Sequence, residues 1–157
     1  MFKKKIISNV SFTLLLLLLA KQIAATPFTD NGDGTIKDSA SGLVWQKCSS
    51  GQNATTCSGT ATALTWATAI TACNSLSLAS KTWRLPNRNE LQSIVDYTKT
   101  SAPMIDATAF PSTQSSYWSS TTYAPFTSFA WYVYFSVGNV LSNFKTDIYY
   151  VRCVSGP

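Results

Sequence analysis

The residues best suited to chemistry in this sequence are four cysteines, Cys48, Cys57, Cys73 and Cys153. Their spacings contain no C-x-x-C pair and the chain has no histidine, which argues against a zinc site. An even number of cysteines in an exported chain predicts two disulfides. Cys48 and Cys57 flank a polar loop without apolar periodicity, so we expect them to pair locally. A bond between Cys73 and Cys153 would then close a loop of about 80 residues and stabilise the fold by about 4 kcal/mol.

The sequence offers no set of residues for catalysis. Without histidine there is no Ser-His or Cys-His nucleophile pair, and neither a G-x-S-x-G elbow nor a P-loop is present. A carboxylate pair for glycoside hydrolysis would have to include Glu90, which the sequence pattern explains as a helix cap. Every thiol has a plausible disulfide partner, so no reactive thiol is left for an oxidase. We therefore expect a protein that is not an enzyme and needs no cofactor.

One acidic segment, Asp30-Asn31-Gly32-Asp33-Gly34, invites comparison with a calcium loop. An EF-hand places oxygen side chains at its first, third and fifth positions, but counting from Asp30 the last two of these are glycines. No glutamate closes the loop either. A structural turn is the favoured interpretation, and a structural calcium between Asp30 and Asp33 remains the alternative.

A binding surface is the chemistry that the last third of the chain favours. Between residues 117 and 150, aromatic residues alternate with serine, threonine and asparagine. Aromatic faces can stack on sugar rings or fill protein pockets, and hydroxyl and amide groups supply adaptable hydrogen bonds. We expect Trp118 and Trp131 to belong to the core. The candidate binding residues, chosen because they sit at strand alternations or hairpin ends, are Tyr123, Tyr132, Tyr134, Asn139, Asn143, Phe144, Lys145 and Tyr149.

Two arginines leave alternatives open. Arg84 and Arg152 could each bind a sulfate or carboxylate of a ligand, or form an ion pair with an aspartate inside the fold.

The N-terminus determines where these residues would work. Residues 1–25 contain Lys3, Lys4 and Lys5, an apolar run that ends in six leucines, and small residues up to Ala25, which is the order of a secretory signal peptide. The apolar run is too short for a retained membrane anchor. We expect cleavage after Ala25, and a mature chain of residues 26–157 in the periplasm, in the medium or at the cell surface.

Charge excludes one class of partner. Four of the twelve basic residues lie in residues 1–25 and all seven acidic residues lie after them, so the mature chain carries a net charge of only +1. This balance gives no support for nucleic-acid binding.

The elements that position the candidate residues can be predicted from periodicity. The pattern of residues 28–46 predicts a turn and a hairpin. Residues 63–76 have the periodicity of a helix, with Thr60 or Thr62 as its N-cap. Asn87 and Glu90 have the spacing of a capping box and indicate the start of a second helix. Trp83 and Leu85 should share the core of that second helix. Strands are expected at residues 116–121, 129–135 and 148–154, with a hairpin turn at 136–139. The fold class is therefore α+β, with two helices packed on a twisted antiparallel sheet in a single domain.

Four stretches of the chain also match a known pattern. They are Phe28-Thr-Asp-Asn-Gly-Asp-Gly-Thr with Gly42-Leu-Val-Trp-Gln-Lys, Trp83-Arg-Leu-Pro-Asn-Arg-Asn-Glu-Leu, Tyr117-Trp-Ser-Ser-Thr-Thr-Tyr, and Ala130-Trp-Tyr-Val with Tyr150-Val-Arg-Cys-Val. Together they resemble the C-terminal domain family of the Legionella collagen-like adhesin, in the same order and over nearly all of residues 27–155.

The resemblance implies a C-type-lectin-like fold, related to formylglycine-generating-enzyme domains, and an adhesin that binds sulfated glycans. It also implies a disulfide from the first helix to the last strand, in agreement with a Cys73 to Cys153 bond. The collagen repeats of the adhesin are missing here.

Two hypotheses for function follow. The first is an exported lectin-like adhesion domain that binds a glycan, and the second is a protein-interaction module of the same fold that recognises a receptor or an envelope partner. A purely structural envelope protein would instead hide the aromatic residues of the C-terminal sheet.

Overall fold

A computed structural model describes residues 27–156 of the chain. The predicted signal peptide, residues 1–25, lies outside the described residues. The elements follow in the order β1 (Phe28–Asp30), β2 (Thr35–Asp38), β3 (Val44–Gln46), α1 (Trp66–Asn74), α2 (Arg88–Ser93), β4 (Ser116–Thr122), β5 (Phe129–Tyr134), β6 (Asn139–Phe144) and β7 (Val154–Ser155). The fold is α+β, as predicted, but its strands form two sheets rather than one.

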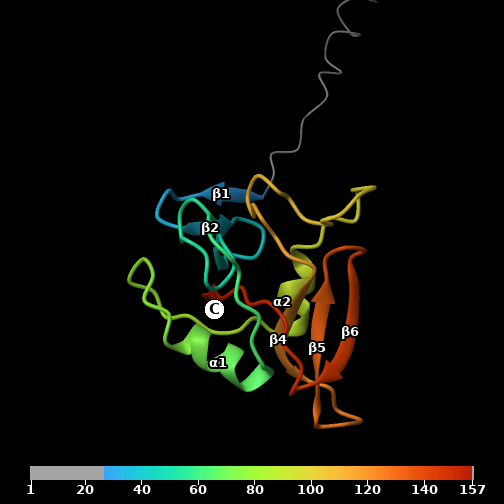
Figure 1. The fold of residues 1–157 in the computed structure, drawn as a ribbon. Coiled ribbons are helices and arrows are strands. Elements are labelled where there is room, and N and C mark those ends of the chain that lie inside the picture. The colour runs from blue at the N-terminus through green and yellow to red at the C-terminus, as the bar shows by residue number, and fades with distance from the viewer. Residues whose placement is uncertain (1–26, 157) are drawn as a thin grey trace, which may run out of the picture.

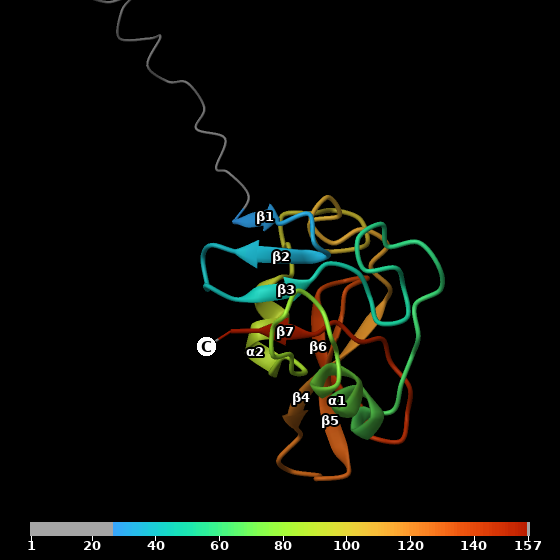
Figure 2. The same ribbon diagram turned by 90° about the vertical axis from the view of Figure 1, so that its left-hand side faces the viewer.

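The first sheet is antiparallel and has the strand order β1-β2-β3-β7. Figure 2 shows these four strands side by side. The hairpin of β2 and β3 confirms the one expected within residues 28–46, with Ile36 opposite Trp45 and both side chains fully buried. The acidic segment at residues 30–34 forms the turn that joins β1 to β2, which pair antiparallel.

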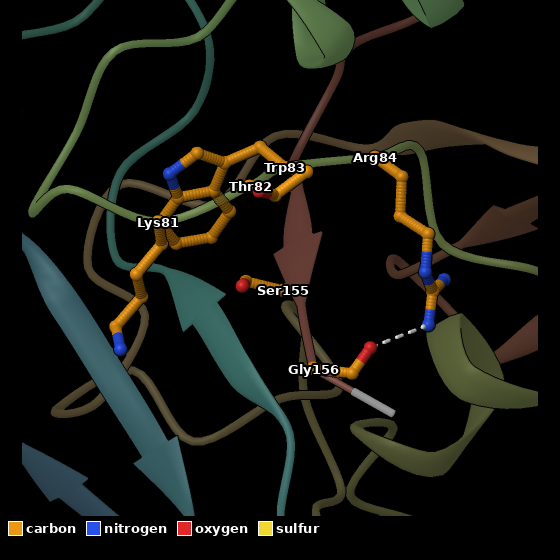
Figure 3. Close-up of a pocket in the computed structure, with 6 residues that line it drawn as sticks. All are labelled: Lys81, Thr82, Trp83, Arg84, Ser155 and Gly156. Carbon is orange, nitrogen blue, oxygen red and sulfur yellow. Dashed lines mark hydrogen bonds between the residues drawn. The ribbon is translucent and has the colours of Figure 1, made fainter.

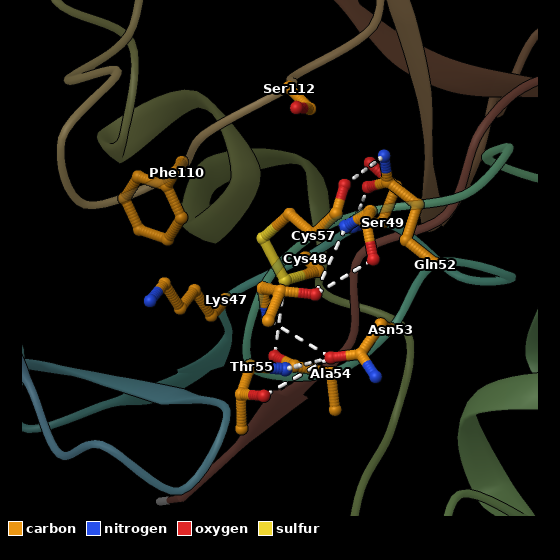
Figure 4. Close-up of a disulfide and its surroundings, with 12 residues drawn as sticks. Lys47, Cys48, Ser49, Gln52, Asn53, Ala54, Thr55, Cys57, Phe110 and Ser112 are labelled. Carbon is orange, nitrogen blue, oxygen red and sulfur yellow. Dashed lines mark hydrogen bonds between the residues drawn. A yellow bond between two sulfur atoms is a disulfide. The ribbon is translucent and has the colours of Figure 1, made fainter.

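The loop after β3 is held by the predicted local disulfide between Cys48 and Cys57. The Gln52 side chain braces the loop from inside (Figure 4): its Oε1 accepts a hydrogen bond from the Ser49 N–H at 2.9 Å, and its Nε2 donates to the Cys57 carbonyl at 3.0 Å. Both cysteines are buried. A polar loop without apolar periodicity is thus ordered by one covalent bond and a few local hydrogen bonds.

The second sheet is antiparallel with the order β4-β5-β6, and the two helices pack on its two faces. Leu91 and Ile94 at α2 share a buried cluster with Tyr117 and Val133 on one face. On the other face, Ala69 and Cys73 of α1 share a second cluster with Trp118. Figure 1 shows the three strands with α1 beside their lower half. The central strand β5 therefore has both faces partly covered, as its aromatic sequence suggested.

The second helix begins as predicted. Asn87 Oδ1 accepts a hydrogen bond from the Glu90 N–H at 2.9 Å, and Glu90 Oε2 accepts one from the Asn87 N–H at 2.8 Å, which completes the capping box. Trp83 and Leu85 are buried, but in the cluster under α1 rather than in the cluster under α2.

The first helix is shorter than expected. It spans Trp66–Asn74 rather than residues 63–76, and its N-cap is Thr65 rather than Thr60 or Thr62. Leu64 forms backbone hydrogen bonds with Tyr149 in both directions, at 2.8 and 3.0 Å, and this pairing holds the chain extended just before the helix.

The C-terminal segment joins the two sheets, and here the predicted strand at residues 148–154 is wrong. Tyr150 bridges to Tyr117 of the second sheet, whereas Val154 pairs with Trp45 of the first, so the segment changes partners between them. Cys153 lies in this segment directly before β7. It is bonded to Cys73 of α1, with 5.4 Å between their Cα atoms, which confirms the second predicted disulfide.

Candidate ligand-binding surface

The register of the second sheet decides which candidate side chains share a face. Residues paired across antiparallel strands point to the same side. Tyr132 of β5 lies opposite Leu141 of β6, Tyr134 opposite Asn139, and Ala130 opposite Asn143. All of them therefore lie on the face that carries α1 and not on the face that carries α2.

Helix α1 covers only part of this face. It packs near β4, over the fully buried Trp118, and leaves the side of β5 and β6 partly open. The residues on the open part are aromatic, amide or aliphatic and are half-buried or exposed. We call this surface the tyrosine face, and it consists of Tyr132, Tyr134, Asn139, Leu141, Asn143 and Tyr149.

The tyrosine face is held by contacts among its own rings. The rings of Tyr132 and Tyr149 lie 4.4 Å apart between centroids with an interplanar angle of 34°, and Tyr149 also lies 4.6 Å from Trp118. Asn143 Nδ2 donates to the Tyr149 hydroxyl at 2.8 Å. The buried Trp118 thus fixes the two half-exposed rings from below, so their orientation does not depend on a ligand.

Tyr132 is the residue of the tyrosine face whose hydroxyl is most affected by burial. Burial, followed by the hydrogen bond with Tyr149, raises the pKa of Tyr132 to about 12. Its hydroxyl therefore keeps its proton at neutral pH and can donate a hydrogen bond.

Lys145 lies at one end of this face and is engaged inside the fold. Its Nζ lies 4.0 Å from the centroid of the Trp66 ring and donates to Thr122 Oγ1 at 2.9 Å. The side chain is half-buried, and it forms no ion pair with any described residue. Its charge is therefore not neutralised by a neighbouring carboxylate.

A second group of rings lies at the end of the sheet, on the loop that joins β4 to β5, in the first half of β5 and at the end of β6. Phe129 and Phe144 pack with their centroids 4.1 Å apart, and Tyr123 meets Trp131 edge to face at 5.0 Å. Phe126 completes the group, 6.0 Å from Phe129. We call this group the aromatic tip, and it consists of Tyr123, Phe126, Phe129, Trp131 and Phe144.

The structure divides the eight candidate binding residues between these two surfaces. Five of them lie together on the tyrosine face, and Lys145 lies at its end. Tyr123 and Phe144 belong to the aromatic tip instead. Trp118 is core, as expected, whereas Trp131 is only half-buried and belongs to the tip.

Sequence reasoning did not select Leu141, Phe126 and Phe129. Leu141 belongs to β6, a strand that the periodicity did not reveal. Residues 139–144 do not alternate between polar and apolar side chains, so no local signal marks this strand and only its pairing with β5 reveals it.

Arg84 does not serve as a free anion-binding group. Its guanidinium forms a two-bond ion pair with Glu90, Nη1 to Oε2 at 2.7 Å and Nη2 to Oε1 at 2.8 Å. Burial alone would raise the pKa of Glu90, but the Arg84 guanidinium and the Asn87 N–H together hold it below its ordinary value. The partner of Arg84 is thus a glutamate and not the aspartate that the sequence suggested.

A hollow of about 300 Å³ lies beside this ion pair. Its lining includes Lys81, Trp83 and Arg84, with Ser155 and Gly156 of the C-terminal segment. In Figure 3 the Lys81 and Arg84 side chains point to opposite sides of the hollow, and Arg84 Nη2 donates to the Gly156 carbonyl at 3.3 Å. Because the two cations do not converge, the hollow is a weaker candidate site than the tyrosine face.

The carboxylates near β1 are used locally. Asp30 accepts hydrogen bonds from the Gly32 N–H at 2.9 Å and from Lys47 Nζ at 2.7 Å, and the hydrogen bond from Lys47 lowers the pKa of Asp30. Asp33 accepts from the N–H and the hydroxyl of Thr35. These contacts account for a structural turn, and residues 27–156 contain no group of three or more acidic, cysteine or histidine side chains that could hold a metal ion.

Residues 34–155 match one protein family, described as the Lcl C-terminal domain. Neither the curated proteins nor the solved structures contain a significant match to this chain. None of the helices within residues 27–156 is long and apolar enough to cross a membrane.

Proposed function

The chain belongs to the Lcl C-terminal domain family, as its motifs indicated, and from this membership and the tyrosine face we propose that it is an exported adhesion domain that binds a glycan. The family is adhesion-related, and the glycan is our inference from the surface. We also infer that the fold is C-type-lectin-like, which is supported by the disulfide from α1 to the segment before β7.

Export and the absence of catalysis belong to the same proposal. Two buried disulfides favour an oxidising compartment, such as the periplasm, the medium or the cell surface. The tyrosine face carries no carboxylate, thiol or imidazole, so it offers hydrogen bonds and ring surface but no group that would transfer a proton or attack a bond. Such a surface binds a ligand without changing it.

The observation that carries the proposal is the row of partly exposed rings and amides on a rigid sheet. Tyr132 and Tyr149 present ring surface against the buried Trp118, and Asn139 and Tyr134 lie in the next row of the sheet. Ring faces can stack on the apolar side of a sugar, while amides and phenol hydroxyls bind its hydroxyl groups. Lys145 at the end of the face is placed to meet a sulfate or carboxylate of an acidic glycan.

The test is a glycan array together with capture on immobilised heparin and fucoidan. We expect salt-sensitive binding by the mature chain, and Tyr134→Ala and Asn139→Ala should each weaken it by about tenfold. Phe126→Ser changes an exposed ring of the aromatic tip and is the matched control. Glycan recognition by this face would be contradicted if the mature chain bound neither to the array nor to the resins. It would also be contradicted if Tyr134→Ala and Phe126→Ser lost the same amount of glycan affinity.

A protein ligand of the same surface is the second candidate. Leu141 is 42% exposed in the middle of the tyrosine face, and β6 is an edge strand of the sheet formed by the described residues. An exposed strand edge can pair with an extended segment of another protein. Affinity capture from envelope extracts separates the candidates, because one stoichiometric protein lost on Leu141→Ser would favour this alternative.

A further inference from the structure

The aromatic tip has a surface chemistry different from that of the tyrosine face. Phe126 is 62% exposed and Phe144 is 51% exposed, and neither ring can form a conventional hydrogen bond. Only Tyr123 and Trp131 in this group carry polar atoms, and both are half-buried. A surface with two exposed phenylalanines therefore suits an apolar partner better than a sugar.

The position of the tip limits the kind of partner. The loop between β4 and β5, to which Phe126 belongs, lies at the end of the molecule farthest from β1 in both views (Figures 1 and 2). Neither of the two hollows near the first sheet, one beside Arg84 and one beside Asp30, is lined by a residue of the tip. A projecting loop end fits a broad and deformable surface better than it encloses a small molecule.

Two cations flank these rings, one on each side of the sheet. The Arg88 guanidinium lies 5.0 Å from the centroid of the Trp131 ring on the side of α2. Lys145, which follows Phe144 directly, reaches Trp66 on the side of α1. Neither cation forms an ion pair with a described residue, and together with Asp147 in the same turn they leave a positive balance at this end.

Exposed apolar rings flanked by two cations suit the surface of an anionic bilayer, which has an apolar interior below negatively charged headgroups. Aromatic side chains enter the region of the lipid headgroups, and lysine and arginine keep their charged ends at the phosphates. We propose that the aromatic tip docks on an anionic lipid surface, with Phe126 and Phe144 entering the interface and Arg88 and Lys145 contacting lipid phosphates. The rings of this site are distinct from those of the tyrosine face and the two surfaces share only Lys145, so one copy of the domain has ring surface for a glycan and other ring surface for a membrane.

Co-sedimentation of the mature chain with vesicles tests the proposal. The vesicles are phosphatidylcholine alone, or phosphatidylcholine with about a third phosphatidylglycerol to supply the negative charge. We expect binding to the anionic vesicles that weakens as salt is raised. Phe126→Ser should reduce the affinity by about fivefold, and the double variant Phe126→Ser/Phe144→Ser by more than about tenfold, because each removes ring surface from the interface.

Matched variants keep the result interpretable. Tyr134→Ala on the tyrosine face should leave vesicle binding unchanged, and Lys145→Gln should weaken binding to the anionic vesicles. Thermal unfolding shows whether the double variant is folded. If it is not, the single variant Phe126→Ser, which changes an exposed residue, serves as the test. The proposal is overturned if the mature chain does not sediment with the anionic vesicles, if Phe126→Ser binds as well as the wild type, or if Tyr134→Ala loses the same affinity.

Discussion

At the scale of single residues, Arg152 has the least ordinary environment in the fold. Its side chain is fully buried, and only Nη2 has a hydrogen-bond partner, the hydroxyl of Thr113 at 3.1 Å. Nε and Nη1 have none, and the guanidinium lies between the rings of Phe110 and Tyr117 at 4.8 and 5.2 Å. Burial lowers the pKa of this group. Of the two roles that the sequence left open for Arg152, neither is seen, because it is closed off from a ligand and pairs with no described aspartate.

We therefore predict that the charge of Arg152 is not what stabilises the fold. Arg152→Met keeps an apolar chain of similar length between the two rings and removes a buried charge, so the free energy of unfolding should stay the same or rise by about 1–3 kcal/mol. Arg152→Ala leaves a cavity and should lower it by about 3 kcal/mol. Urea unfolding at neutral pH measures both. A Met variant as unstable as the Ala variant would show that the guanidinium itself is required.

At the scale of elements, the sequence predicted those parts whose signals are local. The capping box at Asn87 and Glu90, the first hairpin and both disulfides follow from residues close in sequence or from simple pairing, and all are confirmed. The family was recognisable from its motifs for the same reason.

The elements that were missed depend on distant partners. Strand β6 contains Asn139, Ser142 and Asn143, which have low strand propensity, and it forms only because it pairs with β5. Residues 148–154 have high strand propensity, yet they divide their pairing between two sheets. The sequence did not reveal which residues share the tyrosine face. That depends on which residues of β6 pair with which residues of β5.

The ion pair between Arg84 and Glu90 joins two elements and gives a pH-dependent prediction. Arg84 is hydrogen-bonded through its backbone to Val154 of β7 in both directions, so the pair fastens the start of α2 to the first sheet. Since the folded pKa of Glu90 is depressed, its stabilising contribution is present above its ordinary value of 4.5 and is lost as the pH falls through the folded value.

Glu90→Gln can still cap the helix but cannot form the ion pair. We expect it to be less stable than the wild type by about 1 kcal/mol at neutral pH, with the difference vanishing as the solution is acidified below the folded pKa of Glu90. Glu90→Ala loses the cap as well and should be less stable by about a further 1 kcal/mol at every pH. Thermal unfolding between acid and neutral pH measures these differences. A gap between wild type and Glu90→Gln that persists in acid would contradict the role of the charge.

At the scale of the whole molecule, the C-terminal segment holds the two sheets and the tyrosine face in one arrangement. Tyr149 contributes its ring to the face, Tyr150 pairs with β4, Cys153 is bonded to α1 and Val154 pairs with β3. The two disulfides therefore have unequal roles. The bond between Cys48 and Cys57 orders one loop, whereas the bond between Cys73 and Cys153 fixes the segment on which both sheets depend.

Removing the two disulfides separately tests this difference. From the entropy of loop closure, Cys73→Ala/Cys153→Ala should lower the free energy of unfolding by about 4.5 kcal/mol, and Cys48→Ala/Cys57→Ala by about 2.6 kcal/mol. Because Cys153 lies four residues after Tyr149, the first variant should also weaken capture on heparin and fucoidan, while the second should leave it nearly unchanged. Urea unfolding and ligand capture on the same samples give both readouts. Equal losses of stability, or weaker capture only in the variant without the local bond, would mean that the long-range bond does not position the binding surface.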